Sequence, residues 1–170
     1  MKSLRILATL AVALLGSGTA STSAAQSPSN PVAAPKPKVA LVSTKMVLER
    51  KFRLLADAAR AQGVELAWTR VDAEGDEGVA RALAGARFVL IDAPRADDRA
   101  LVERIAGARL RDAALPGVGI HVMSPPTRMQ ALRADGAVAQ RVFEYYVGGM
   151  RENHERLFGY LRALDAGDGS

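Results

Sequence analysis

The five residues FVLID, Phe88–Asp92, form the most regular strand pattern of the chain, with four apolar residues followed directly by a carboxylate. The hexapeptide KVALVS, Lys38–Ser43, has the same character and is bounded by Pro37 and by polar residues. Short apolar runs without polar alternation are typical of strands that are buried on both faces. Such strands belong to parallel sheets with helices on both sides, so these two stretches set the fold class.

Two further strands are predicted, at residues 64–71 (VELAWTRV) and 118–123 (VGIHVM), and helical patterns separate the four strands. The first helix has apolar residues at spacings of four, three and four, at Leu48, Phe52, Leu55 and Ala59. We expect Ser43 and Thr44 to cap the start of this helix and Gly63 to cap its end.

The next two helices are predicted from composition and from their first residues. An alanine-rich helix at 76–86 follows a turn at Gly75, and another helix begins at Asp97 or Asp98. Strands that alternate with helices imply βαβ units. We therefore predict an α/β fold, a small flavodoxin-like three-layer module with about four parallel strands in the order 2-1-3-4 and a C-terminal helical hairpin.

The two ends of the chain differ in character from this domain. Residues 1–25 have a positive start at Lys2 and Arg5, an apolar run of ten residues and small residues at 23–25, which predicts a cleavable signal peptide. An uncleaved anchor is the alternative. Four prolines at 26–37 predict a stiff linker, so the expected organisation is signal peptide 1–25, linker 26–37, one α/β domain 38–164 and a frayed tail 165–170. This organisation places the protein in the periplasm or outside the cell.

Composition excludes several classes of protein. The chain has no cysteine, which removes disulfides, thiolate metal sites and a lipid-modified cysteine from consideration. The net charge of +5 becomes +3 once the two positive charges of the signal peptide are removed, and the arginines are interleaved with acidic residues. We therefore expect no nucleic-acid partner, and no membrane span after signal cleavage.

Ligands of doubly wound sheets gather where the strand order reverses, at the carboxyl ends of the strands. In the order 2-1-3-4 this point lies between the first and third strands. It would present Ser43, Thr44 and Lys45 on one side and Asp92 on the other, with Ser124 of the fourth strand beside them, and the candidate ligand-binding residues are Thr44, Asp92 and Ser124. One interpretation is a polar crevice for a small ligand. The other is that Ser43 and Thr44 only cap a helix and Asp92 only begins a turn. We favour this second interpretation, because helix capping by itself explains a Ser and a Thr at these positions. The segment directly after the first strand, STKMVLER, contains no glycine, so no phosphate-binding loop is predicted.

The sequence predicts no catalytic residue and no metal site. Ser124 lacks a neighbouring base and a nucleophile-elbow glycine pattern. The two histidines, His121 and His154, have no carboxylate constellation around them, and no cofactor is evident.

The segment at 143–164, FEYYVGGMRENHERLFGYLRAL, predicts the helical hairpin that closes the sheet. Two glycines end the first helix, and one of them takes the positive φ that a helix end commonly needs. Val147 and Met150 fall on the apolar stripes of the two helices, so we expect both to face the core.

This hairpin also resembles a pattern of the cobaltochelatase large subunit (CobN) and the related magnesium chelatase H subunit. In that family a helix that ends in a Tyr and a Gly-Gly pair is followed by Asn and by a helix ending near Tyr-Leu. The matching residues here are Tyr145, Gly148, Gly149, Asn153, Tyr160 and Leu161. The chain departs from the family in having Arg-Glu-Asn-His where members have Pro-Glu-Asn-Leu, in its short length and in its signal peptide.

The resemblance implies a module similar to the N-terminal part of the large subunit, without the regions that insert the metal. It implies a non-catalytic role in docking or in tetrapyrrole or metal handling, with other chelatase-like subunits as partners and tetrapyrrole or cobalt as the ligand. Two alternatives stay open: the front piece of a truncated or split cobaltochelatase, and a generic periplasmic α/β domain that binds a small ligand or a partner.

Overall fold

A parallel sheet of four strands lies at the centre of the structure, a computed structural model that describes residues 36–113, 115, 117–120 and 136–168. The strands are β1 (Lys38–Ser43), β2 (Glu65–Arg70), β3 (Phe88–Asp92) and β4 (Gly117–Ile120). Their order across the sheet is β2-β1-β3-β4, and every pairing is parallel. The predicted fold class and strand order are confirmed.

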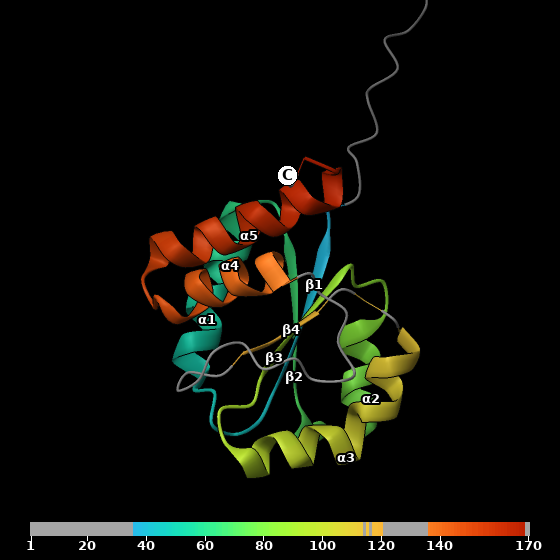
Figure 1. The fold of residues 1–170 in the computed structure, drawn as a ribbon. Helices are drawn as coiled ribbons and strands as arrows, with labels where there is room; N and C mark the ends of the chain where they lie inside the picture. Colours follow the sequence, from blue (N-terminus) through green and yellow to red (C-terminus); the bar gives the residue numbers. More distant parts are fainter. Residues whose placement is uncertain (1–35, 114, 116, 121–135, 169–170) are drawn as a thin grey trace, which may run out of the picture. The chain divides into compact units, whose positions relative to one another are not determined.

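Five helices cover the two faces of this sheet (Figure 1). They are α1 (Glu49–Ala61), α2 (Val71–Leu83), α3 (Ala96–Ala113), α4 (Gly136–Val147) and α5 (Arg151–Ala166). The helices α1, α4 and α5 pack on one face, and α2 and α3 pack on the other. Within the described residues, no helix is both long and apolar enough to cross a membrane.

The strand β1 is buried on both sides, which explains its unbroken apolar sequence. Ala40 and Val42 point into the core beneath α2 and α3, whereas Val39 and Leu41 point into the core beneath α1, α4 and α5. All four have no exposed surface. Because full burial of a Val or Leu side chain contributes roughly 1.5–3 kcal/mol, the alternation fixes the register of this strand firmly.

The start of α1 differs from the prediction. The helix begins at Glu49 without a side-chain cap, so Ser43 and Thr44 do not cap it. Leu48, predicted on the apolar stripe of the helix, lies at its N-cap and is 70% exposed. After β1 the chain first makes a turn, in which the Val47 amide donates to the Thr44 carbonyl at 3.0 Å. The predicted end is confirmed, since Gly63 follows the helix with a φ of +68°.

Other boundaries shift by a few residues. The segment α2 is interrupted at Gly75, whose φ of 60° and ψ of −156° are not helical, and it ends at Leu83 rather than at residue 86.

The strand β4 ends at Ile120, and residues 121–123 of the predicted strand lie outside the described part of the chain. The predicted signal peptide and residues 26–35 of the linker also lie outside it. Asp165 and Ala166, expected in a frayed tail, belong to α5, and Gly167 caps that helix with a φ of 85°.

The helical hairpin is present as α4 and α5, and Gly149 takes the expected positive φ of 67° between them. The exposure of two apolar residues differs from the prediction. Val147 is 38% exposed and Met150 is 64% exposed, although both fall on apolar stripes. The corner between the helices turns these two side chains outward, while Tyr146 and Leu157 on either side of it are fully buried.

Candidate functional site

The predicted switch point lies at the carboxyl ends of β1 and β3. The chain leaves β1 towards α1 on one face of the sheet and leaves β3 towards α3 on the other, so the two connections diverge here. Ser43 and Asp92, the last residues of these strands, pair in register. Both side chains are buried, with exposures of 0% and 2%.

Asp92 is the centre of a polar cluster that joins three elements. Its Oδ2 accepts a hydrogen bond from Tyr146 of α4 at 2.6 Å and lies 2.9 Å from Lys51 Nζ of α1. The same ammonium lies 4.1 Å from the centroid of the Tyr146 ring, which is a favourable cation–π distance. We call Asp92, Lys51 and Tyr146 the Asp92 cluster.

Burial makes this pairing necessary. A carboxylate removed from water loses its hydration, and only close partners recover that free energy. Lys51 supplies the opposite charge and Tyr146 supplies a hydroxyl donor. Burial, the charge of Asp92 and the hydrogen bond to Asp92 all raise the pKa of Tyr146 well above its ordinary value of 10.0. The phenol therefore stays protonated and remains a donor at neutral pH.

His154 in the first turn of α5 packs beside this cluster. Its ring centroid is 6.3 Å from that of Tyr146, and the side chain is 1% exposed. Neither ring nitrogen forms a hydrogen bond within the described residues. Burial lowers the pKa of His154 from the ordinary value of 6.5. The Tyr146 backbone raises this pKa in part, and the charge of Lys51 lowers it further. His154 is therefore neutral at pH 7.

Ser43 is held by an aromatic pair rather than by a helix. Trp68 Nε1 donates to Ser43 Oγ at 2.7 Å, and Ser43 Oγ donates to the Thr69 carbonyl at 3.4 Å. Trp68 in turn stacks on Phe52 of α1 with centroids 4.2 Å apart. Trp68 is the single tryptophan of the chain, so its fluorescence reports on this edge of the sheet.

Thr44 shapes the turn after β1. It is 1% exposed, and its Oγ1 accepts a hydrogen bond from the Met46 amide at 3.5 Å. Within the described residues, no hydrogen bond joins Thr44 to Asp92. The third predicted ligand-binding residue, Ser124, lies outside the described part of the chain. Of the three, the structure therefore places Asp92 in a polar cluster and Thr44 in the adjoining turn.

The arrangement is suited to binding. The described residues contain no group of three or more His, Asp or Glu side chains placed to hold a metal ion. Lys51 is the accessible member of the Asp92 cluster, with 30% of its side chain exposed. An ammonium has three donor hydrogens, and Asp92 takes one of them. Sequence reasoning missed Lys51, although its place four residues before Leu55, which is 1% exposed, is a signal that its side chain turns inward.

The residues of the family pattern pack the corner between α4 and α5. Tyr145 and Tyr160 meet edge to face, with centroids 6.3 Å apart. The Asn153 side chain lies against Gly148 so closely that a Cβ at that glycine would collide with it. Leu161 is 2% exposed in the core beneath α1. These contacts account for the pattern through packing, and Tyr146 of the Asp92 cluster lies between Tyr145 and the two glycines in sequence.

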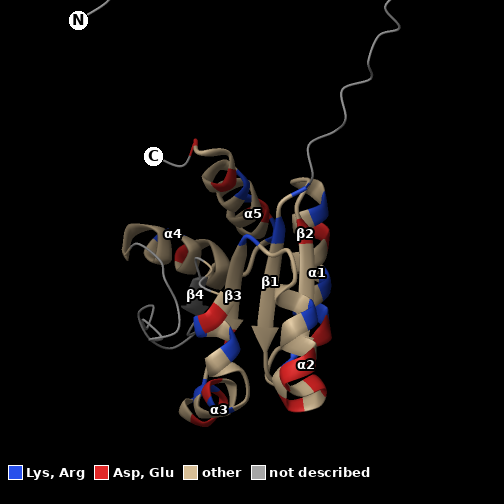
Figure 2. Ribbon diagram, turned by 90° about the vertical axis from the view of Figure 1, so that its right-hand side faces the viewer, with Lys and Arg blue, Asp and Glu red and all other residues tan. Residues whose placement is uncertain are grey.

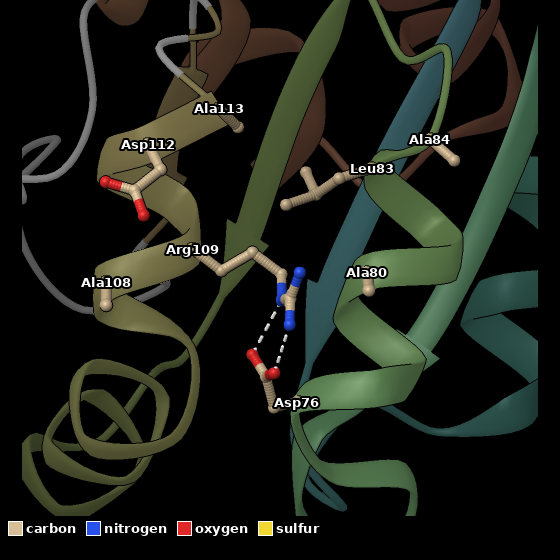
Figure 3. Close-up of a pocket in the computed structure, with 8 residues that line it drawn as sticks. All are labelled: Asp76, Ala80, Leu83, Ala84, Ala108, Arg109, Asp112 and Ala113. Atoms are coloured by element: carbon tan, nitrogen blue, oxygen red, sulfur yellow. Dashed lines mark hydrogen bonds and ion pairs between the residues drawn. The ribbon is translucent and has the colours of Figure 1, made fainter.

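A groove on the other face of the sheet has a different character (Figure 3). It has a volume of about 470 Å³ and is lined by residues of α2 and α3, among them Ala80, Leu83 and Ala108. Arg109 reaches across it to Asp76 and donates from Nε at 2.7 Å and from Nη2. This pairing lowers the pKa of Asp76 and raises that of Arg109. Figure 3 shows the ion pair spanning the groove, which ties α2 to α3.

Charged side chains elsewhere are distributed without a dominant sign. Figure 2 shows basic and acidic segments interspersed along α1, α2 and α3. Several of them form local pairs, such as Arg53 with Glu49 and Arg151 with Glu155, each four residues apart. Paired charges of this kind describe a solvated surface rather than a continuous basic patch.

Comparison with known proteins shows a similarity of fold. No family model and no curated protein matches the sequence. Among solved structures, the catalytic subunit of cobaltochelatase from Mycobacterium tuberculosis matches with a TM-score of 0.54 and 19% identity. The match covers 77% of this chain and 11% of that subunit. The chain thus has a fold similar to a part of a chelatase subunit and corresponds to about a tenth of its length.

Replacement of Tyr146 by Phe tests the hydrogen bond to the buried carboxylate. We expect the free energy of unfolding to fall by about 1.5–3 kcal/mol, because a hydrogen bond to a charged group is lost. Tyr145→Phe is the matched control, since its ring packs on Tyr160 without a hydroxyl bond in the described residues, and we expect a change below about 0.5 kcal/mol. Urea unfolding of the two variants makes the comparison, and equal losses would contradict this role of Tyr146.

The lowered pKa of His154 predicts a loss of stability in mild acid. The unfolded chain takes up the histidine proton near pH 6.5, whereas the folded chain takes it up only at lower pH. Stability from this group is therefore complete above pH 6.5 and falls as the pH drops below it. The variant His121→Gln retains His154 as its single histidine, so NMR titration gives this pKa directly. A value at or above 6.5 would be inconsistent with the buried, unpaired ring.

Proposed function

We propose that this chain is an exported, non-catalytic module of a chelatase-like system, which handles a tetrapyrrole or its metal ion and docks beside larger subunits. The observation that carries the proposal is the fold match to part of a cobaltochelatase catalytic subunit over 77% of this chain. The predicted signal peptide supports an exported location, in the periplasm. The polar residues at the switch point support a role in binding.

The chemistry of the switch point favours binding over catalysis. Ser43 Oγ is engaged by Trp68 and Thr69, and no general base contacts it within the part of the chain that the structure describes. The carboxylate of Asp92 is held by Lys51 and Tyr146, which leaves a nearly neutral cluster with one partly exposed cationic side chain, that of Lys51. Such a group can recognise an anionic substituent, and the propionate-type side chains of a tetrapyrrole are of this kind.

Titration of the purified protein with cobalt-free corrinoid, haem and cobalt(II) tests the proposal. We expect saturable binding of at least one of them. Calorimetry measures this binding, and Trp68 emission should change with it, because this ring adjoins the switch point. Co-purification with a chelatase-like large subunit tests the docking role. Arg109→Gln, on the α2–α3 groove, is the control and should bind as the unaltered protein does. The absence of both binding and association would overturn the proposal.

A second candidate is a generic periplasmic domain that binds another small ligand at the same edge. The buried carboxylate at the switch point favours it, because such edges are common ligand sites in doubly wound folds. A different ligand that binds the unaltered protein, but not the folded variants Asp92→Asn or Thr44→Val, would support this candidate. A third, the front piece of a split cobaltochelatase, requires an in-frame continuation in the adjacent DNA.

A further inference from the structure

Four large apolar side chains are exposed in the described residues, two at the start of α1 and two at the corner between α4 and α5. They are Leu48 (70% exposed), Leu54 (41%), Val147 (38%) and Met150 (64%). Scattered single apolar residues on a surface are ordinary, but a contiguous group marks an interaction site. The position of the four therefore decides what they mean.

Along the chain, each of the four lies within four residues of Lys51 or of the Tyr146 and His154 rings beside it. Leu48 is the N-cap of α1, three residues before Lys51, and Leu54 follows Lys51 by three residues, a spacing that makes Lys51 and Leu54 neighbours on the helix surface. The Lys51 ammonium lies over the ring of Tyr146, the residue that precedes Val147. Met150 is the N-cap of α5, and its carbonyl accepts a hydrogen bond from the amide of His154, whose ring adjoins Tyr146. We call Leu48, Leu54, Val147 and Met150 the apolar rim.

Figure 1 agrees with this placement, since the corner between α4 and α5 lies beside the first turns of α1. Two further observations join the same elements. The pKa of Arg151, the first residue of α5, is raised mainly by its hydrogen bond to Glu155, and the charge of Asp57 on α1 adds to this effect. Arg162 of α5 donates to the Gln62 carbonyl at the end of α1 at 2.9 Å. The rim therefore borders one region of the surface, formed by α1 and the α4–α5 corner.

The polar group within this region determines the chemistry of an occupant. Lys51 keeps donor hydrogens that Asp92 does not use, and 30% of its side chain is exposed. Asp92 itself is 2% exposed, so Lys51 is the more accessible partner of this ion pair. A carboxylate can pair with such a donor, whereas an uncharged hydroxyl forms a weaker bond. An apolar body next to that carboxylate would cover the rim.

We propose that Lys51 and the apolar rim form a binding site for a small amphipathic carboxylate, with its anionic group on the Lys51 ammonium and its apolar body against the rim. This inference rests on the proposed function in one respect: it locates the site at which the handled molecule is held and names the group that molecule must carry. A protein partner on the same surface is the competing occupant.

Sodium decanoate and uncharged decanol are probes that test both halves of the site. Calorimetry of the whole protein should give a decanoate affinity at least about fivefold higher than that of decanol, because only decanoate pairs with Lys51. Leu48→Ser and Met150→Ser change exposed side chains and should leave the fold intact. Each should weaken decanoate binding by about fivefold through loss of apolar contact.

The neutral double variant Lys51→Gln/Asp92→Asn removes the ammonium without leaving a buried carboxylate unpaired. It should bind decanoate and decanol equally, whereas Arg109→Gln on the opposite face should bind as the unaltered protein does. Equal binding of the two probes by the unaltered protein, or full affinity in the serine variants, would overturn the inference. Rim variants that lose a large-subunit partner but keep decanoate would assign the rim to a protein.

The outcome is separable from that of the function test. Decanoate binding that depends on the rim, without any corrinoid, haem or cobalt(II) binding, would retain the site and reject the chelatase-like ligand. Corrinoid or haem binding that is unchanged in Leu48→Ser and Met150→Ser would retain the function and reject this site.

Discussion

The buried carboxylate of Asp92 constrains the rest of this structure. It ends β3 in the middle of the sheet, where 2% of the residue is exposed and water cannot solvate the charge. The carboxylate must therefore meet a cation and a donor, and it finds Lys51 of α1 and Tyr146 of α4. These contacts join residues 41 and 54 positions apart, so one charge links the sheet to two helices of the covering layer. The geometry at the switch point follows from that requirement.

The order of elements could be predicted because it depends on local patterns. The apolar runs of β1 and β3 are buried on both faces, and such runs can only be central strands of a covered sheet. Short helical connections then limit the strand order to a few arrangements. Gly63 and Gly149 marked helix ends because each adopts a positive φ that other residues avoid.

The partners of buried polar groups could not be predicted in this way. Ser43 was expected to cap a helix, yet its hydroxyl accepts from Trp68, a residue on the neighbouring strand. Lys51 lies on an apolar stripe, and only the tertiary structure identifies the carboxylate it meets. Met150 fits the apolar period of α5 but faces outward, because the preceding glycine corner sets its direction. Each case depends on contacts between segments that the sequence separates.

If the Asp92 cluster organises this edge, Lys51 and Asp92 must be energetically coupled, and a double-mutant cycle measures that coupling most directly. The variants are Lys51→Met, Asp92→Leu and their combination, with free energies of unfolding from urea titration. Lys51→Met alone should cost about 2–3 kcal/mol, since it leaves the carboxylate buried and unpaired, and the double variant should recover at least about 1 kcal/mol of the summed losses. Additive losses would contradict the account, because they would mean that the two side chains stabilise the fold independently.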